Sequence, residues 1–391
     1  MTLTPQEKLY AGLSQRMPSL KSSPIRDILK VIDEPDMISF AGGLPSASSF
    51  PDIQLSEIDR ASLQYGPSEG DLALRAAVAQ DLTHRGLTTQ PEHVLILSGS
   101  QQGIDLTAKL VVDHHSTVAV ESPTYLAALQ VFSLFGARYL PFTPFDLNAL
   151  TNPKTKPALT YAIPTFQNPT GYVYSRQQRQ ALAAACDANG SILFEDDPYR
   201  ELMYSACDRT PACSFIQTSR WIYQSSFSKT LAPGLRLGYL TCSPELFPLL
   251  AQLKQAADLH SNRVSQQIIG SLISAPGYTE SLRLIVDQYR ERRDHFNALL
   301  TQHIGSLASW QLPAGGLFFW LTLDPSRHID TQALLRKALK ASVAFMPGEP
   351  FYPEGSVPKD SCLRLNFSHA SPEAMDTGLR RLAQLLHQAH Q

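Results

Sequence analysis

Short apolar runs alternate with helix-like stretches along most of this 391-residue chain, and this alternation restricts its possible folds more than any other property. The runs are Val94–Leu97, Thr117–Val120, Leu159–Ile163, Ser191–Phe194 and Trp221–Gln224. Continuous apolar runs of this length are typical of strands that are buried on both faces, as in parallel sheets covered by helices. We therefore expect an α/β fold with a large domain built on a mostly parallel central sheet.

Segments before and between these runs have the composition of helices. The first, Asp71–Arg85, is followed by Gly86, a residue type that often ends helices because it tolerates a positive φ. Similar stretches are Gln101–Val112, Tyr125–Phe135 and Arg176–Ala188. Helices between successive strands are expected to pack on both faces of the sheet.

The C-terminal part of the chain has a different pattern. Residues 244–300 contain few turn residues apart from Pro276 and Gly277, so we expect long helices there that bridge two domains. Alternating runs at residues 317–323 and 361–368, together with further helical stretches, predict a smaller α+β domain. The predicted organisation is an N-terminal arm over residues 1–45 that joins the small domain, a large domain over residues 46–285 and a small domain over residues 286–391.

Charge and composition narrow the choice of partners and compartment. The 33 Lys and Arg nearly balance the 35 Asp and Glu without forming a basic block, so no nucleic-acid partner is expected. The polar start MTLTPQEKLY lacks the apolar core of a signal peptide, and no apolar run could cross a membrane. The five cysteines form no CxxC pair, so we expect reduced thiols, a cytoplasmic location and no metal site. Because charged residues make up only 17%, below the usual ~25%, another subunit is expected to cover part of the surface.

The segment Ser225–Arg236 concentrates groups that bind phosphate and react with carbonyls. Ser226 and Ser228 offer hydroxyl donors and Arg236 a planar guanidinium, a combination that suits a phosphate group. Lys229, held beside that phosphate, would become a Schiff-base amine if burial or a nearby cation destabilised its ammonium form. For this segment alone, a solvated turn with a surface lysine is the alternative.

Two more segments carry polar residues after apolar runs. At the C-terminal end of a parallel strand, where such sheets bind ligands, Asp196 could keep a pyridine nitrogen protonated and Tyr199 could bond to a ring hydroxyl. The alternative is a helix N-terminus that carries acidic residues. Asn168 could donate to a phenolate oxygen, although Asn-Pro-x-Gly is also an ordinary turn.

Several other residues have both a functional and a structural interpretation. Ser100 and Gln101 open a helix after a glycine, where backbone amides bind anions, but such turns are common without a ligand. Arg364 on a strand could clamp a carboxylate through two hydrogen bonds, or it could form a surface ion pair. Tyr125 could stack on a cofactor ring or belong to the core, and Tyr65 could be a plain turn residue.

The order of these segments resembles a known family. It resembles the fold-type-I pyridoxal-phosphate aminotransferases of the aspartate-aminotransferase superfamily from about residue 22 to residue 370. Ser39–Pro51, followed by YGPSEGDLALR, is similar to the branch of 2-aminoadipate and aromatic aminotransferases that is related to the effector domains of MocR regulators. The matching motifs are SGSQQ at 98–102, NPTG at 168–171, DDPY at 196–199, SFSKTLAPGLRLGY at 226–239 and RLNFS at 364–368.

The resemblance implies a role for each matching residue, with pyridoxal 5′-phosphate (PLP) as the cofactor. Lys229 would form the Schiff base and move the proton at the substrate Cα, Asp196 would pair with the ring nitrogen, and Arg364 would bind the α-carboxylate. The other cofactor contacts would be Ser100, Gln101, Tyr125, Asn168, Tyr199, Ser226, Ser228, Arg236 and, from the neighbouring subunit of a homodimer with shared active sites, Tyr65. The other substrate contacts would be Ser23, Arg26, Gly43 and Asn168.

The implied function is transfer of the amino group of an L-amino acid, aromatic or dicarboxylic like 2-aminoadipate, to a 2-oxo acid by a ping-pong mechanism. A PLP-dependent lyase or synthase of the same fold is one alternative, because it would share the cofactor-binding residues, and a non-catalytic PLP-binding sensor is another. Ser225 stands where the family usually has Gly and His369 where it often has an aromatic residue, and the sequence assigns neither a role. The natural donor and acceptor stay open, as does whether Arg26 meets a distal carboxylate or swings aside for an aromatic ring.

Overall fold

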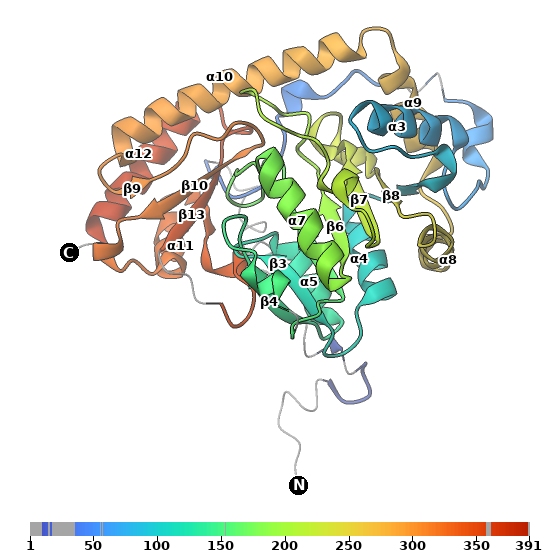
Figure 1. Cartoon of the computed structure of the whole chain (residues 1–391). Helices are drawn as coiled ribbons and strands as arrows, with labels where there is room; N and C mark the ends of the chain where they lie inside the picture. Colours follow the sequence, from blue (N-terminus) through green and yellow to red (C-terminus); the bar gives the residue numbers. More distant parts are fainter. Residues whose placement is uncertain are drawn as a thin grey trace.

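The structure is a computed structural model that describes residues 10–14, 16–17, 36–54, 56, 58–152, 154–356 and 361–389. In these residues the largest sheet has seven strands in the order β2-β8-β7-β6-β5-β3-β4 (Figure 1). Neighbouring strands pair in parallel except for β8, which is antiparallel to both β2 and β7. This arrangement confirms the predicted α/β class and the mostly parallel sheet. The strands are β2 (Val94–Leu97), β3 (Thr117–Glu121), β4 (Arg138–Phe142), β5 (Leu159–Ala162), β6 (Ile192–Asp196), β7 (Trp221–Ser226) and β8 (Gly238–Cys242).

Helices cover both faces of this sheet (Figure 1). One face packs against α3 (Leu72–His84) and α7 (Arg176–Asn189). The other packs against α4 (Ser100–Val111), α5 (Leu126–Leu134) and α8 (Phe247–Asp258). The four helices predicted between the apolar runs are therefore confirmed as α3, α4, α5 and α7. The short helix α6 (Asn148–Thr151) lies between β4 and β5 in the chain.

Burial on both faces explains why the strands are continuously apolar. In β3, the side chains of Val118 and Val120 enter the cluster formed with α4, α5 and α8. Ala119, between them, enters the cluster formed with α3 and α7. Since successive side chains of a strand point to opposite faces, a strand covered on both sides needs an apolar residue at every position.

Each of the five predicted runs forms a strand, but two strands of the sheet had no predicted counterpart. β4 lies at the edge of the sheet, and its exposed Arg138 and Pro141 interrupt the apolar run that would signal a buried strand. β8 begins at Gly238 and contains Thr241, so its composition is also weak evidence for a strand. Both strands are held in place by pairing with neighbours rather than by their own composition.

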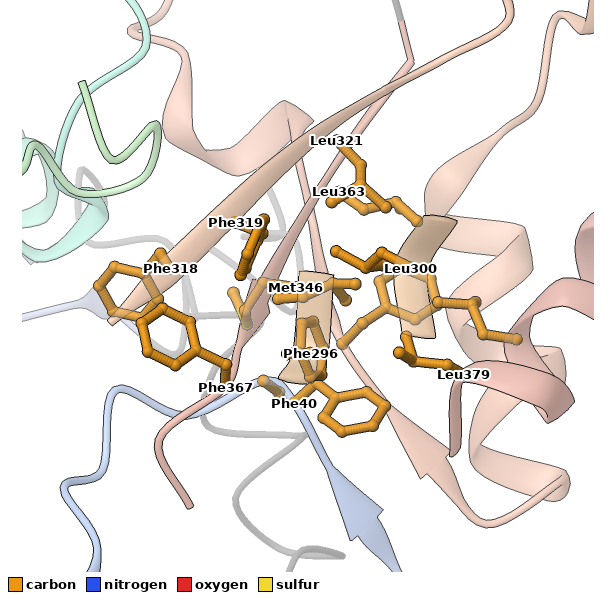
Figure 2. Packing of buried hydrophobic residues seen from close by; sticks show 14 of the residues in the cluster. Phe40, Phe296, Leu300, Phe318, Phe319, Leu321, Met346, Leu363, Phe367 and Leu379 are labelled. Carbon is orange, nitrogen blue, oxygen red and sulfur yellow. The ribbon is translucent and has the colours of Figure 1, made fainter. Parts of the chain in front are cut away.

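The C-terminal part forms a second sheet with its own core (Figure 2). Its strands, in the order β12-β13-β10-β9, pair antiparallel and are accompanied by α11 (Thr331–Lys340) and α12 (Pro372–Gln388). Figure 2 shows Phe296, from the long helix α10 (Tyr278–Ile304), packed among Phe40, Met346 and their apolar neighbours. The strands are β9 (Ala308–Ser309), β10 (Phe318–Leu323), β12 (Met346–Pro347) and β13 (Cys362–Asn366), and a separate pair consists of β1 (Ile38–Ser39) and β11 (Val343–Ala344).

The segment predicted as long helices forms three of them, α8, α9 (Arg263–Ser274) and α10 (Tyr278–Ile304). The break before α10 was predicted from Pro276 and Gly277, whereas the break between α8 and α9 was not, because residues 259–262 contain neither glycine nor proline. The predicted division after residue 285 falls inside α10, and the two proposed boundaries, after residues 45 and 285, stay a prediction. In the described ranges, no helix combines the length and the apolar character that crossing a lipid bilayer requires.

Candidate active site

A cavity of about 390 Å³ lies where the chain leaves the C-terminal ends of β5, β6 and β7. The loops that follow these strands meet there, as expected for ligand sites of parallel sheets. The structure brings together ten of the predicted site residues in its lining: Ser100, Gln101, Tyr125, Asn168, Asp196, Tyr199, Ser226, Ser228, Lys229 and Arg236.

Lys229 lies in a short turn of helix directly after β7. Its Nζ donates to the carbonyl of Gly43 at 2.8 Å and lies 5.8 Å from the centroid of the Tyr199 ring. Burial lowers the pKa of Lys229 from its usual value near 10.5 to about 8, and the charges of Arg364 and Arg236 act in the same direction. The neutral amine, which is the nucleophilic form, is therefore far more populated near neutral pH than in an ordinary lysine.

Asp196 ends β6 and is 3% exposed. Its Oδ2 accepts a hydrogen bond from the Tyr161 hydroxyl at 2.7 Å, whereas Oδ1 has no partner in the described structure. Burial raises the pKa of Asp196 to about 6, although the nearby side chains of Tyr161 and Gln224 oppose this effect. A buried carboxylate oxygen without a donor implies that a ligand provides one. The alternative of acidic residues at a helix N-terminus is wrong, because no helix begins here.

Hydroxyl and guanidinium groups gather at the start of α4. Gly99 precedes this helix with φ +82°, and a Cβ at Gly99 would lie 2.5 Å from Nη2 of Arg236. Only glycine therefore allows the Arg236 guanidinium to approach this turn so closely. Ser226 caps the turn that contains Lys229, because its Oγ accepts the Ser228 amide at 3.1 Å. Together these groups form a corner suited to a phosphate.

The buried phenol of Tyr199, the half-buried phenol of Tyr125 and the amide of Asn168 line another side of the cavity. The Asn168 Nδ2 donates to the Tyr199 hydroxyl at 3.5 Å, and the Tyr125 hydroxyl donates to Gln101 Oε1 at the same distance. Burial raises the pKa of Tyr125 to about 12 and also raises that of Tyr199. Both phenols therefore stay protonated near neutral pH.

Arg364 on β13 approaches the cavity through Asn168. Its Nη1 donates to Asn168 Oδ1 at 2.8 Å and its Nη2 to the Ala41 carbonyl at 2.6 Å, while Nε has no partner among the described residues. Arg364 is 4% exposed and forms no ion pair with a described carboxylate, so burial lowers its pKa to about 10. The alternative of a surface ion pair is therefore wrong, and a buried guanidinium of this kind needs an anionic ligand.

The remaining predicted residues lie apart from the cavity or outside the description. Tyr65 is 75% exposed and its ring contacts His260, with the centroids 5.8 Å apart. Gly43 touches the site only through its carbonyl, and Ser23 and Arg26 lie outside the described residues. The two unassigned positions differ from each other: the Ser225 hydroxyl donates to the Asp197 carbonyl at 2.7 Å, and His369 is exposed.

The sequence did not predict the residues that contact and orient the site residues, such as Tyr161 and Phe318. Tyr161 was interpreted only as part of an apolar strand, yet its hydroxyl orients Asp196. The Arg364 guanidinium lies 4.2 Å from the centroid of the Phe318 ring, whose face helps to bury its charge. The only available signal was the phenol hydroxyl of Tyr161, which needs a partner when it is buried.

The sequence matches a known protein family over most of its length. A family model for aminotransferase class I and II matches residues 35–382. The chain belongs to this family. The sequence-based prediction of a PLP-dependent aminotransferase is thereby confirmed.

Individual members of the aminotransferase family are similar to the chain over nearly its whole length. The 2-aminoadipate transaminase of Thermus thermophilus is 35% identical over 384 residues, which cover 94% of each chain. Aromatic-amino-acid aminotransferase 1 of Thermococcus litoralis is 33% identical, with 95% of this chain and 93% of that protein covered. The crystal structure of an alpha-aminoadipate aminotransferase from Thermus thermophilus, complexed with N-(5′-phosphopyridoxyl)-L-leucine, matches with a TM-score of 0.88 at 33% identity and covers 99% of each chain.

Proposed function

We propose that this aminotransferase moves the amino group of an L-amino acid with a large side chain, aromatic or dicarboxylic like 2-aminoadipate, to a 2-oxo acid. One observation carries the proposal. A lysine whose pKa is lowered, a buried carboxylate oxygen without a donor and a buried guanidinium without an anion all lie in or beside one cavity. These groups are Lys229, Asp196 and Arg364.

The residues of the cavity fit PLP. The free Oδ1 of Asp196 lacks the donor that a protonated ring nitrogen would supply. Asn168 and Tyr199 would bind the ring oxygen and Tyr125 would stack on the ring. The phosphate would be held by the group of side chains at the start of α4 and after β7: Ser100, Gln101, Ser226, Ser228 and Arg236. When bound, PLP supplies an aldehyde that exchanges amines and a ring that withdraws electrons from the substrate Cα.

Each of the three groups then has a defined task. Lys229 would hold the cofactor through its amine and, once displaced by the substrate, would move the proton at the substrate Cα. Its pKa of about 8 suits this work, because a proton carrier is most effective when its pKa is near the operating pH. Arg364 would anchor the substrate α-carboxylate and so fix the orientation of Cα toward Lys229.

Gly43, which lacks a side chain, lies beside Lys229 and leaves the substrate the room that a side chain would take. A Cβ at Gly43 would lie 3.2 Å from the Phe318 ring and 3.8 Å from the Lys229 Nζ, so any larger residue would narrow the site. The names of two similar proteins, a 2-aminoadipate transaminase and an aromatic-amino-acid aminotransferase, point to the same range of substrates.

We also propose a homodimer, working in the cytoplasm, in which Tyr65 serves the active site of the neighbouring subunit. Leu63 and Tyr65 are 72% and 75% exposed, and Leu259 near them in the fold is 42% exposed, so a second subunit would remove apolar surface from water. Among the described residues, Cys186, Cys207, Cys213 and Cys242 form no disulfide, which supports a reducing compartment.

The proposal is tested by half-reactions followed by absorbance. The purified holoenzyme is mixed with single L-amino acids in the absence of any 2-oxo acid. We expect the cofactor band to convert to that of the pyridoxamine form fastest with L-2-aminoadipate or an aromatic amino acid, and to return when a 2-oxo acid is added. Release of ammonia without that conversion would favour a lyase, and no conversion with any amino acid would contradict transamination.

A further inference from the structure

A second cavity, separate from the active site, is lined by aromatic rings. It has a volume of about 450 Å³, within the usual range for small-molecule sites, and shares no lining residue with the cavity around Lys229. Its lining residues come from the C-terminal ends of β3 and β4, from the loop after β5, and from β9, β10 and the segment between them in the smaller sheet. We call it the aromatic pocket and define it by Glu121, Phe145, Tyr172, Trp310 and Trp320.

The four rings come from both sides of the pocket. Phe145 and Tyr172 belong to the loops after β4 and β5, and their ring centroids are 5.1 Å apart. Trp310 and Trp320 come from the smaller sheet and the segment beside it.

The polar atoms of two of these rings, Trp310 and Tyr172, are already used elsewhere. The Trp310 Nε1 donates to Asn297 Oδ1 at 2.9 Å, and the Tyr172 hydroxyl donates to Gln178 Oε1 at 3.0 Å. Neither Asn297 nor Gln178 lines the pocket. The two side chains therefore present ring surface to an occupant, and the faces of such rings attract cations.

Glu121 is the one acidic residue of the lining, which includes no Lys, Arg or His. It ends β3 and is 2% exposed. Its Oε2 accepts the Ile163 amide at 2.7 Å and its Oε1 accepts the Tyr174 hydroxyl at 2.6 Å. In the part of the chain that the structure describes, no basic side chain forms an ion pair with it. The pocket thus combines a buried carboxylate that lacks a counter-charge with rings that favour positive charge.

The surroundings of Glu121 also determine how its charge depends on pH. Burial raises the pKa of Glu121 to about 7, opposed by hydrogen bonds from Tyr174, Ile163 and Gln167. The ionisable groups that face it are the phenols of Tyr174 and Tyr161, whose own pKa values burial and the Glu121 charge raise, so both stay neutral. No basic group shifts the pKa of Glu121. A cation in the pocket would therefore favour the carboxylate form and displace its proton.

We propose that the aromatic pocket binds an organic cation, a substituted or quaternary ammonium group, whose charge is met by Glu121 and by the surrounding rings. The site is distinct from the amine-transfer site, so the proposal does not depend on the proposed function. A quaternary ammonium ion suits a test especially well, because it has no N–H with which to react at Lys229.

Intrinsic fluorescence gives a direct test. The chain has three tryptophans, and two of them, Trp310 and Trp320, line the pocket. A Trp221→Phe variant leaves only these two as reporters. The holoenzyme of this variant is titrated with choline and with its uncharged isostere 3,3-dimethylbutan-1-ol, at constant ionic strength. We expect a saturable change with choline and an affinity for the isostere that is weaker by about tenfold or more.

Two further comparisons link the signal to Glu121 and to the rings. Between about pH 6 and about pH 8 choline affinity should rise several-fold, because the carboxylate replaces the neutral acid. Glu121→Gln should remove this pH dependence and most of the affinity. Trp310→Leu should weaken choline binding while keeping the pH dependence. This second variant tests the proposal independently if the Glu121 variant does not fold. Equal binding of choline and its isostere, binding that does not depend on pH, or no binding of choline would each overturn the proposal.

Discussion

The Nη1 of Arg364 lies 2.8 Å from Oδ1 of Asn168, and Asn168 in turn donates to the Tyr199 hydroxyl. This short chain of hydrogen bonds joins the smaller sheet to the loop after β5 and to the end of β6. It connects the residue proposed to bind the substrate carboxylate with the two proposed to bind the cofactor ring. A substrate that binds Arg364 is therefore held in a fixed relation to the ring.

Replacing Arg364 with glutamine should raise KM for the amino acid by about a hundredfold, because a buried charged hydrogen bond to the carboxylate is lost. The cofactor should still bind, since Asp196 and the residues proposed to bind the phosphate are unchanged. Steady-state kinetics with a saturating 2-oxo acid measures the change. Arg381→Gln is a matched control, because Arg381 binds only the carbonyls of Ala341 and Ser342. An unchanged KM in the Arg364 variant would mean that another cation binds the carboxylate.

Attachment of PLP to the apoprotein should accelerate with rising pH and level off above about pH 8. The reactive form of Lys229 is the neutral amine, and burial, Arg364 and Arg236 lower its pKa to about 8. Below this value most of the amine is protonated and the reaction is slow. Stopped-flow absorbance measures the rate.

In the Arg364→Gln variant, one of the charges that lower the Lys229 pKa is absent, so the midpoint of the rate profile should move to higher pH. A midpoint near the ordinary lysine pKa in the unmodified protein would show that the site does not perturb Lys229.

Lys254 is predicted to support the phosphate-binding turn, although it does not line the active-site cavity. Its side chain is fully buried, and Nζ donates to Gln102 Oε1, Asp258 Oδ2 and Ser261 Oγ, each at 2.8 Å. Gln102 Oε1 also accepts the Ser98 amide at 2.9 Å, which fixes the turn before Ser100. Lys254→Met should therefore weaken PLP binding by about tenfold.

The comparison with pyridoxal, which lacks the phosphate, identifies the cause. In fluorescence titrations of the apoprotein, Lys254→Met should reduce the affinity for pyridoxal much less than the affinity for PLP. Lys109→Met is the control, since Lys109 lies on α4, the helix that carries Gln102, but is paired with Asp105 at the surface. An equal loss for both ligands would indicate general destabilisation instead of a role in phosphate binding.

The loop that carries Asn168 should depend on a buried arginine. Arg179 is fully buried, and its Nη2 donates to the Pro164 carbonyl and to Thr165 Oγ1, both at 2.9 Å. Its Nη1 lies 3.7 Å from Oε1 of Glu195, whose pKa burial still holds above its usual value. Arg179→Met would leave this carboxylate buried without a cation and should cost about 3–5 kcal/mol in unfolding free energy.

Urea denaturation measures this cost, with Arg283→Met as the control. Arg283 forms two ion pairs on α10 but is 58% exposed, so solvent screens these pairs and its loss should leave the unfolding free energy almost unchanged. Similar losses of unfolding free energy in the Arg179 and Arg283 variants would show that the burial of Arg179 does not make it more important for stability.

Much of the site could be predicted from the sequence, because parallel strands deliver their C-terminal residues to one edge. Asn168, Asp196 and Lys229 each follow an apolar run, so the strand pattern alone brings them near one another. The contacts behind them could not be predicted, because they depend on which strands are neighbours. Tyr161 reaches Asp196 only because β5 pairs with β6.

The edge strand β4 was missed for a physical reason. An edge strand needs fewer apolar side chains, and Arg138 and Pro141 are exposed in β4. The burial of Arg364 was equally hidden, since the sequence shows that it lies on a strand but not that Phe318 and Phe351 cover its guanidinium.

The central claim is that Lys229 holds the cofactor, and reduction followed by peptide mapping tests it most directly. Sodium borohydride converts the link between a lysine and the cofactor aldehyde into a stable amine, which mass spectrometry locates in the digested protein. We expect a phosphopyridoxyl group on Lys229 and none in a Lys229→Ala variant. This variant should still fold but should not catalyse amino-group transfer. Label on a different lysine, or no label after incubation with PLP, would contradict the central claim.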